Sequence, residues 1–118
     1  MTFQAGIWHI AATVNIDPDT LNLGSQGQWI TVYAIIDTEY ECIIDIDTVI
    51  LDDTIYAEWG EIQLDGCLMV KFNRTAVIDY LIGMSYKDGE YVTLTVSGSF
   101  IDGIQFSGED IIRVVNNA

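Results

Sequence analysis

Short runs of β-branched and aromatic residues, each bounded by turn residues, constrain the fold of this chain more than any other feature. Residues 29–36 are apolar at almost every position, and residues 91–96 alternate β-branched with other apolar side chains. Asp17-Pro18-Asp19, Asp65-Gly66 and Asp102-Gly103 supply turns between such runs. About seven to nine short segments at intervals of roughly 8 to 12 residues predict an antiparallel β-sandwich. The apolar run 29–36 predicts a central strand that is covered on both faces.

One segment departs from the strand pattern. Asn73 is a good helix N-cap, and apolar residues then recur at helical spacing over residues 74–81. We therefore expect one short helical turn near residues 74–81. The single proline and the ten scattered glycines form no linker, so residues 1–118 are expected to make one β-sandwich domain.

The charge of the chain limits its partners. Four Lys and Arg against 18 Asp and Glu give a net charge of −14, while half of the residues are hydrophobic. The apolar content predicts a folded domain rather than an acidic disordered tail. Four scattered cations cannot form the basic surface that nucleic acid or an anionic membrane surface requires. The apolar runs are far shorter than the ~20 residues that span a bilayer, so no membrane insertion is expected.

The order of several short motifs resembles a known module. Val14 to Leu23, a Gly/Ser-rich loop and Trp29-Ile30-Thr31-Val32-Tyr33 are followed by Ile44 to Leu51, Leu68 to Arg74, Val92 to Gly98 and Asp102 to Val114. This series is similar to an immunoglobulin-like module repeated in archaeal and bacterial exported and cell-surface proteins, of the kind associated with cohesins and dockerins. The resemblance covers nearly the whole chain from Val14 onward.

The resemblance implies an immunoglobulin-like sandwich that acts as a structural or interaction module, and it implies no catalytic residue. It also implies an extracellular or cell-surface location. The first residues show no basic region followed by an apolar stretch, so no signal peptide is visible, and we expect a cytosolic chain or a mature or excised piece of an exported one. Many members carry an Asp-Gly-Asp-Gly insertion before the strand at Leu68, where this chain has only Asp65-Gly66-Cys67.

Calcium is the cofactor that the acidic residues favour. Carboxylate oxygens coordinate Ca²⁺, and the bound ion relieves the repulsion among the acids. The spacing does not follow the EF-hand loop, and an acidic solvent face remains the alternative. The candidate ligands are Asp17, Asp19, Asp45, Asp47, Asp52 and Asp53.

Two cysteines and one sequon raise the question of covalent modification. Cys42 and Cys67 permit either one disulfide or two buried thiols, and the sequence leaves both open. Asn73-Arg74-Thr75 fits the pattern of an N-glycosylation acceptor, although a helix cap at Asn73 is the stronger interpretation.

Exposed aromatic residues are candidates for ligand binding. Trp29 opens the predicted central strand and is expected in the core, whereas Trp59, beside Gly60 and Glu61, is a candidate to stack on a sugar ring. The lone histidine, His9, is flanked by apolar residues and is expected to be a packing or surface residue rather than a catalytic base. The carboxylates are expected to be solvated structural acids rather than a glycosidase pair.

The N-terminal residues 1–13 lie outside the repeated pattern, and Phe3 to Thr13 are unusually apolar. They predict a strand that either pairs within its own sheet or adds to the open edge of a neighbouring copy. The sequence thus predicts a non-enzymatic structural or protein-interaction module of a cell-surface assembly, with self-association by strand addition as one mode. The alternative is a carbohydrate-binding module stabilised by calcium.

Overall fold

The computed structural model describes residues 9–36, 44–63, 67–101 and 103–116 of the chain. These residues form nine strands and one helix, so the expected all-β class is confirmed. The elements are β1 (His9–Asp17), β2 (Thr20–Asn22), β3 (Trp29–Ile36), β4 (Ile44–Leu51), β5 (Ile55–Tyr56), β6 (Trp59–Ile62), β7 (Cys67–Asn73), α1 (Arg74–Gly83), β8 (Tyr91–Phe100) and β9 (Gln105–Val115).

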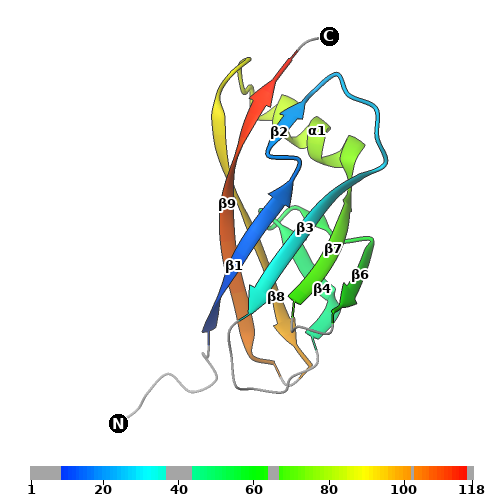
Figure 1. Cartoon of the computed structure of the whole chain (residues 1–118), viewed down its shortest axis with the longest axis vertical. Coiled ribbons are helices and arrows are strands. Elements are labelled where there is room, and N and C mark those ends of the chain that lie inside the picture. Colours follow the sequence, from blue (N-terminus) through cyan, green and yellow to red (C-terminus); the bar gives the residue numbers. More distant parts are fainter. Residues whose placement is uncertain (1–8, 37–43, 64–66, 102, 117–118) are drawn as a thin grey trace.

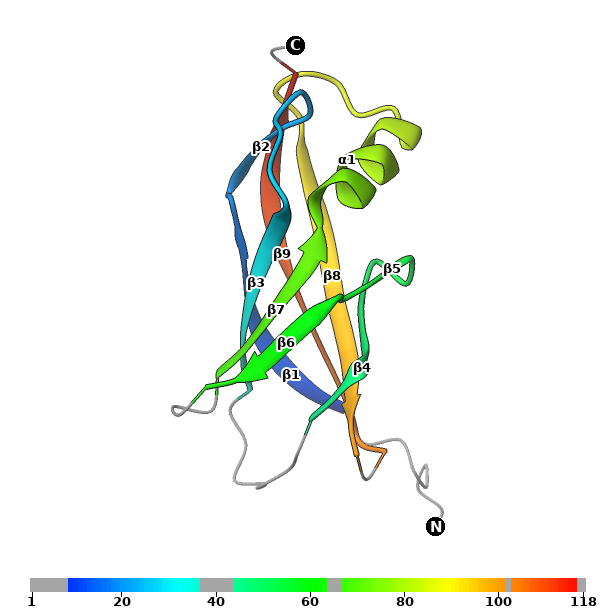
Figure 2. The ribbon, with the colours of Figure 1, turned by 90° about the vertical axis from the view of Figure 1, so that its right-hand side faces the viewer.

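The strands form one continuous sheet that curls on itself (Figure 1). Its order is β5-β4-β8-β9-β1-β3-β7-β6, and β2 adds to β9. The curl arises in β1, because residues 9–11 pair with β9 whereas residues 12–17 pair with β3. The sheet therefore has a first half around β8 and β9 and a second half around β3 and β7, and Figure 2 shows these halves facing each other.

The pairing is mixed, so the expectation of a purely antiparallel sheet is corrected. Both β1 and β2 run parallel to β9, while the other neighbouring strands are antiparallel. A parallel pair needs a long connection. Here the entire chain between β1 and β9 provides it, since the first and last strands meet at the centre of the strand order.

The core lies between the two halves of the curled sheet. Inward side chains alternate with outward ones along β3, where Ile30, Val32 and Ala34 are buried. Their outward neighbours are half-buried or exposed, and Ile35 keeps 55% of its surface exposed. The strand is central, as predicted, but only its inner face is covered. Trp29 lies outside the buried core and is half-buried, which corrects the expectation that it is a core residue.

The close approach of β1 to β9 depends on a glycine. A Cβ atom at Gly108 would meet the carbonyl oxygen of Ala12 and the side chain of Val14. Ala12 is the first residue of β1 that pairs with β3 instead of β9. Gly108 therefore makes room for the backbone of β1 where that strand changes partner.

The helix is the predicted one, extended by two residues to Gly83. The Asn73 side chain accepts a hydrogen bond from the backbone N–H of Ala76 at 3.0 Å, which confirms the predicted N-cap. Val77, Ile78 and Leu81 are buried in the core. Residues 44–51 and 105–115 each form one continuous strand, β4 and β9, whereas residues 55–62 divide into β5 and β6.

Candidate functional site

A wide bulge in β4 shapes the outer face of the first half of the sheet. Asp45 pairs with Ser99 and Ile50 pairs with Ser97, so residues 46–49 of β4 stand opposite Gly98 alone. Such an insertion bends a strand and interrupts its pairing. The bulge therefore leaves Gly98, between Ser97 and Ser99, without a regular partner on β4.

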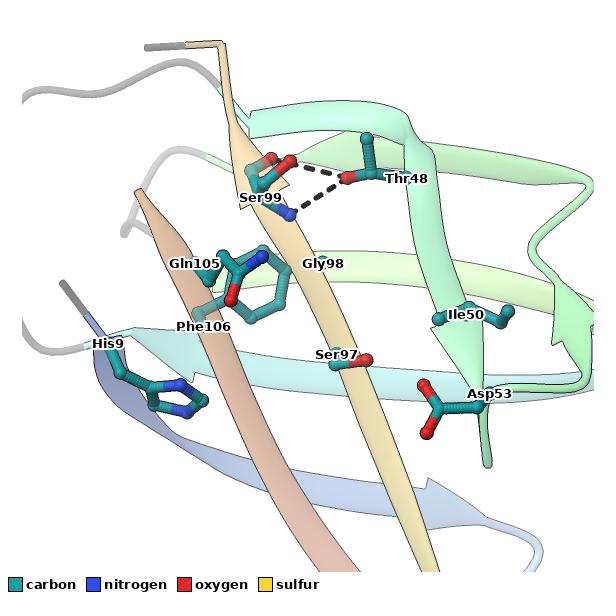
Figure 3. Close-up of a pocket in the computed structure, with 9 residues that line it drawn as sticks. All are labelled: His9, Thr48, Ile50, Asp53, Ser97, Gly98, Ser99, Gln105 and Phe106. Carbon is teal, nitrogen blue, oxygen red and sulfur yellow. Dashed lines mark hydrogen bonds between the residues drawn. The ribbon is translucent and has the colours of Figure 1, made fainter. Parts of the chain in front are cut away.

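Thr48 holds the bulge in place. Its hydroxyl accepts a hydrogen bond from the backbone N–H of Ser99 at 2.8 Å and donates one to the carbonyl of Asp45 at 2.7 Å. Figure 3 shows this hydroxyl beside the backbone of Ser99. The side chain thus replaces part of the strand pairing that the bulge removes.

A groove of about 400 Å³ lies on this face. Small residues on β8 form its floor, the residues of β9 and β1 lie on one side of β8, and those of β4 and the following turn lie on the other. We call it the outer groove. Its lining residues, drawn in Figure 3, are His9, Thr48, Ile50, Asp53, Ser97, Gly98, Ser99, Gln105 and Phe106.

The outer groove offers polar groups for binding. Within the part of the chain that the structure describes, the side chains of Ser97, Ser99, Gln105 and Asp53 make no hydrogen bond to protein. Among the described residues that line the groove, none is Lys or Arg. A ligand here would meet hydroxyl, amide and carboxylate groups and no fixed positive charge.

His9 has a serine partner at the margin of this groove. Its Nε2 lies within hydrogen-bond distance of the Ser107 hydroxyl, because the two residues sit on the paired strands β1 and β9. A serine nucleophile also needs a group that orients the imidazole. No carboxylate among the described residues hydrogen-bonds to His9. The structure therefore shows a histidine–serine contact without the third group of a triad among the described residues, and we assign it no reaction.

The structure separates the predicted calcium ligands. Asp17 and Asp19 flank the turn after β1, Asp45 and Asp47 lie in the bulged part of β4, and the last pair, Asp52 and Asp53, follows β4. Among the described residues, no three His, Cys, Asp or Glu side chains come together as a group that could hold a metal ion. Calcium binding remains a prediction.

Asp52 is engaged in structural contacts. One of its carboxylate oxygens accepts a hydrogen bond from the Tyr80 hydroxyl at 2.8 Å, and the other accepts the backbone N–H of Thr95 at 2.7 Å. The hydrogen bond to Asp52, followed by burial and by the negative charge of Asp52, raises the pKa of Tyr80 to about 12. This candidate ligand therefore connects the turn to α1 and β8.

Trp59 lies on the outer face of the second half and keeps 43% of its surface exposed. It pairs with Lys71 across β6 and β7, and the Lys71 Nζ lies 5.6 Å from the centroid of the indole ring. Tyr33 and Met69 pair in the next row of the same face. The exposure of Trp59 leaves it accessible to a ligand, while the ammonium group occupies one approach to the ring.

The candidate sites of covalent modification are Cys42, Cys67 and Asn73. Cys42 lies outside the described residues, and the structure describes only the backbone of Cys67. Both the disulfide and the pair of thiols therefore remain open. The carbonyl oxygen of the Asn73 side chain caps α1, and glycosylation of this residue remains a prediction.

Sequence reasoning did not find the outer groove. His9, Gln105, Ser97 and Asp53 come from separate parts of the chain, and only the strand order and the β4 bulge bring them to one face. One signal was present in the sequence, because the three small residues Ser97-Gly98-Ser99 directly follow the strand predicted at residues 91–96, and β8 continues through them. Small residues in a strand mark a place where another group can approach closely.

Comparisons with known proteins found no match among protein families, curated proteins or solved structures. The resemblance to an immunoglobulin-like surface module therefore remains a prediction from the sequence. Within the described residues, no helix has the length and apolar character to cross a membrane.

Proposed function

We propose that this chain is a non-catalytic structural or protein-interaction module of an extracellular or cell-surface assembly, and that its curled sheet is a variant of the immunoglobulin-like sandwich. The exchange of β1 between the two facing halves supports this fold assignment, because each half keeps its own packed inner face. The location rests on the sequence resemblance.

The observation that carries the proposal is the exposed edge at β6. This four-residue strand ends the strand order, and its Trp59 and Ile62 keep 43% and 46% of their surfaces exposed. Natural edge strands avoid association by being short or by carrying charged side chains, above all lysine, or proline. The strand β6 is short and carries Glu61, but it has no lysine or proline, and two of its four side chains are large exposed apolar groups. An edge of this kind accepts an added strand through backbone hydrogen bonds and apolar contacts.

We propose that the strand added to β6 comes from a second copy of this chain. From His9 onward, the N-terminal segment pairs within its own sheet, so the part proposed to reach a neighbouring copy is residues 1–8. These residues include Phe3, Ile7 and Trp8 and carry no acidic residue. A neutral apolar segment avoids the repulsion between two chains that each carry a charge of −14.

Sedimentation and light scattering against protein concentration test the proposal. We expect self-association that strengthens at about 0.5 M salt, where charge repulsion is screened within several ångströms. Ile62→Lys and deletion of residues 1–8 should each abolish it. Ile111→Lys is the matched control, because Ile111 is similarly exposed, at 58%, but lies on the internal strand β9. A wild-type protein that stays monomeric at every concentration contradicts self-association.

The exposure of Trp59 supports a second candidate function, the binding of carbohydrate by stacking on this residue. Polysaccharide pull-down would show saturable binding that Trp59→Ala abolishes and that Tyr91→Ala, at an exposed aromatic on β8, leaves unchanged. The proposed stabilisation by calcium has its own readout, a melting temperature that rises when millimolar calcium is added to chelated protein. An unchanged melting temperature contradicts it.

A further inference from the structure

The outer groove is preformed by the fold. Its floor is the segment Ser97 to Ser99 of β8, and the Phe106 ring packs against Gly98 from the core side, 2.8 Å from where a Cβ atom would stand. Phe106 is fully buried. Because packed core supports the floor, the groove needs no rearrangement to receive a ligand. Its volume of about 400 Å³ suits a small molecule or one unit of a larger one.

The groups in the outer groove both donate and accept hydrogen bonds. Ser97 and Ser99 offer hydroxyls and Gln105 offers an amide, and none of these side chains has a protein partner among the described residues. A sugar hydroxyl also both donates and accepts hydrogen bonds. It can therefore act as donor or as acceptor toward these serine and glutamine side chains. The Asp53 carboxylate, on the other side of β8, can accept charge-assisted hydrogen bonds from two hydroxyls.

Charge disfavours anions in the outer groove, and hydrogen-bond direction disfavours a ligand that only donates. A phosphate or carboxylate would meet the Asp53 carboxylate without any Lys or Arg in the lining, on a chain of charge −14. The Asp53 carboxylate would attract a primary ammonium group, but such a group only donates hydrogen bonds and would leave the amide N–H groups of Gln105 without an acceptor. A neutral ligand with several hydroxyls satisfies both kinds of group, and the half-buried Ile50 can contact its C–H bonds.

We infer that the outer groove binds one neutral sugar unit, whose hydroxyls meet Ser97 and Ser99 on the floor, Gln105 on the β9 side and Asp53 on the β4 side. This inference does not depend on self-association at β6 or on Trp59. The groove lies on the first half of the sheet, whereas β6 lies at the far end of the second half.

Amide chemical shifts of the full chain, recorded by NMR, test the inference. The probes are the methyl glycosides of glucose, galactose, mannose and N-acetylglucosamine, each added up to about 50 mM, above the roughly millimolar dissociation constant that a few hydrogen bonds provide. We expect at least one of them to give saturable shifts that centre on residues 97–99, 105 and 50.

Two leucine variants on the same strand separate binding from folding. Ser97→Leu fills the floor and should weaken binding at least about ten-fold, equivalent to roughly 1.4 kcal/mol. Thr93→Leu is the control, because Thr93 also faces outward on β8 but lies outside the groove lining. Both variants should keep the amide spectrum of the folded protein. Asp53→Asn, which changes the charge at nearly constant shape, should weaken binding several-fold.

Three results would overturn the inference. The first is the absence of saturable shifts at these residues with any of the four glycosides. The second is shifts centred on Trp59 and Lys71 alone, which would support carbohydrate binding by Trp59 and remove the groove from it. The third is stronger saturation at the groove by methylammonium or inorganic phosphate than by every glycoside, which would assign the groove to a charged ligand.

Discussion

The Tyr80 hydroxyl donates a 2.8 Å hydrogen bond to the Asp52 carboxylate, and this contact joins α1 to the turn between β4 and β5. The second oxygen of Asp52 and its backbone N–H both bond to Thr95 on β8. Asp52 and Asp53 have φ angles of 49° and 52°, in the left-handed region that Asp tolerates better than most residues. One carboxylate thus connects a tight turn, the helix and an internal strand.

Removal of the Tyr80 hydroxyl should weaken this connection. Tyr80→Phe deletes a hydrogen bond to a charged group, so we expect the free energy of unfolding to fall by about 1.5 to 3 kcal/mol. Tyr91→Phe is the control, because Tyr91 is 69% exposed and its hydroxyl has no partner among the described residues. Urea denaturation measures both variants. If Tyr80→Phe is as stable as Tyr91→Phe, the contact between Tyr80 and Asp52 does not contribute to the stability of the fold.

The same contact predicts a loss of stability at alkaline pH. The pKa of Tyr80 is raised from 10.0 to about 12, so the folded protein keeps the phenol proton after the unfolded chain has lost it. The stabilisation is complete below pH 10 and declines as the pH rises from 10 to about 12. The difference between the tyrosinate absorbance titrations of wild type and Tyr80→Phe should give this raised pKa. A difference curve centred near 10 would contradict it.

The loss of stability caused by three Gly→Ala substitutions should depend on which atoms the new methyl group would meet. At Gly98 the Cβ would lie 2.8 Å from the Phe106 ring and 3.1 Å from Val49, so Gly98→Ala should cost about 1 to 3 kcal/mol. Gly108→Ala should cost more, because its Cβ would meet the backbone of Ala12, which cannot yield as a side chain does.

The control for this series is Gly83, where a Cβ would meet no atom of the described residues within 4 Å. Gly83 ends α1, so Gly83→Ala should be neutral or raise stability by up to about 1 kcal/mol. Thermal and urea unfolding of all three variants would check the order. A Gly108→Ala protein as stable as Gly83→Ala would contradict the close approach of β1 and β9.

Asp110 should stabilise β1 after that strand has left β9. One of its carboxylate oxygens accepts the backbone N–H of Ile16 at 2.9 Å, and the other accepts the N–H of Ile111 at 2.9 Å. Asp110→Ala leaves the N–H of the buried residue Ile16 without its acceptor and should cost about 1 to 3 kcal/mol in urea denaturation. Glu109→Ala, at an exposed neighbour, should change stability by less than about 0.5 kcal/mol. Equal effects of the two substitutions would refute this role.

Local sequence patterns were sufficient to predict several strands and the helix. The apolar run at residues 29–36 and the alternating run at residues 91–96 both lie within strands, and Asn73 caps the predicted helix. These elements depend on side-chain periodicity and on short-range hydrogen bonds, which a sequence records directly. The strand at 29–36 was nevertheless expected to be covered on both faces, and only its inner face is.

The candidate site was less predictable, because it depends on pairing between distant strands. The calcium candidates were chosen by residue type, yet the fold disperses them and commits Asp52 to Tyr80 and Thr95. The bulge opposite Gly98 follows from the pairing of β4 with β8, which the local sequence of either strand does not encode alone.

The sequence by itself determined that this chain is a β-rich, strongly acidic domain with one capped helix, because strand propensity, turn residues and charge are local properties. Only the tertiary structure decided that β1 changes partner between Ala11 and Ala12 and that the sheet curls there. That change requires a glycine, Gly108, and a carboxylate, Asp110, from a strand nearly one hundred residues away. Long-range packing selected this arrangement, and with it the face that carries the outer groove.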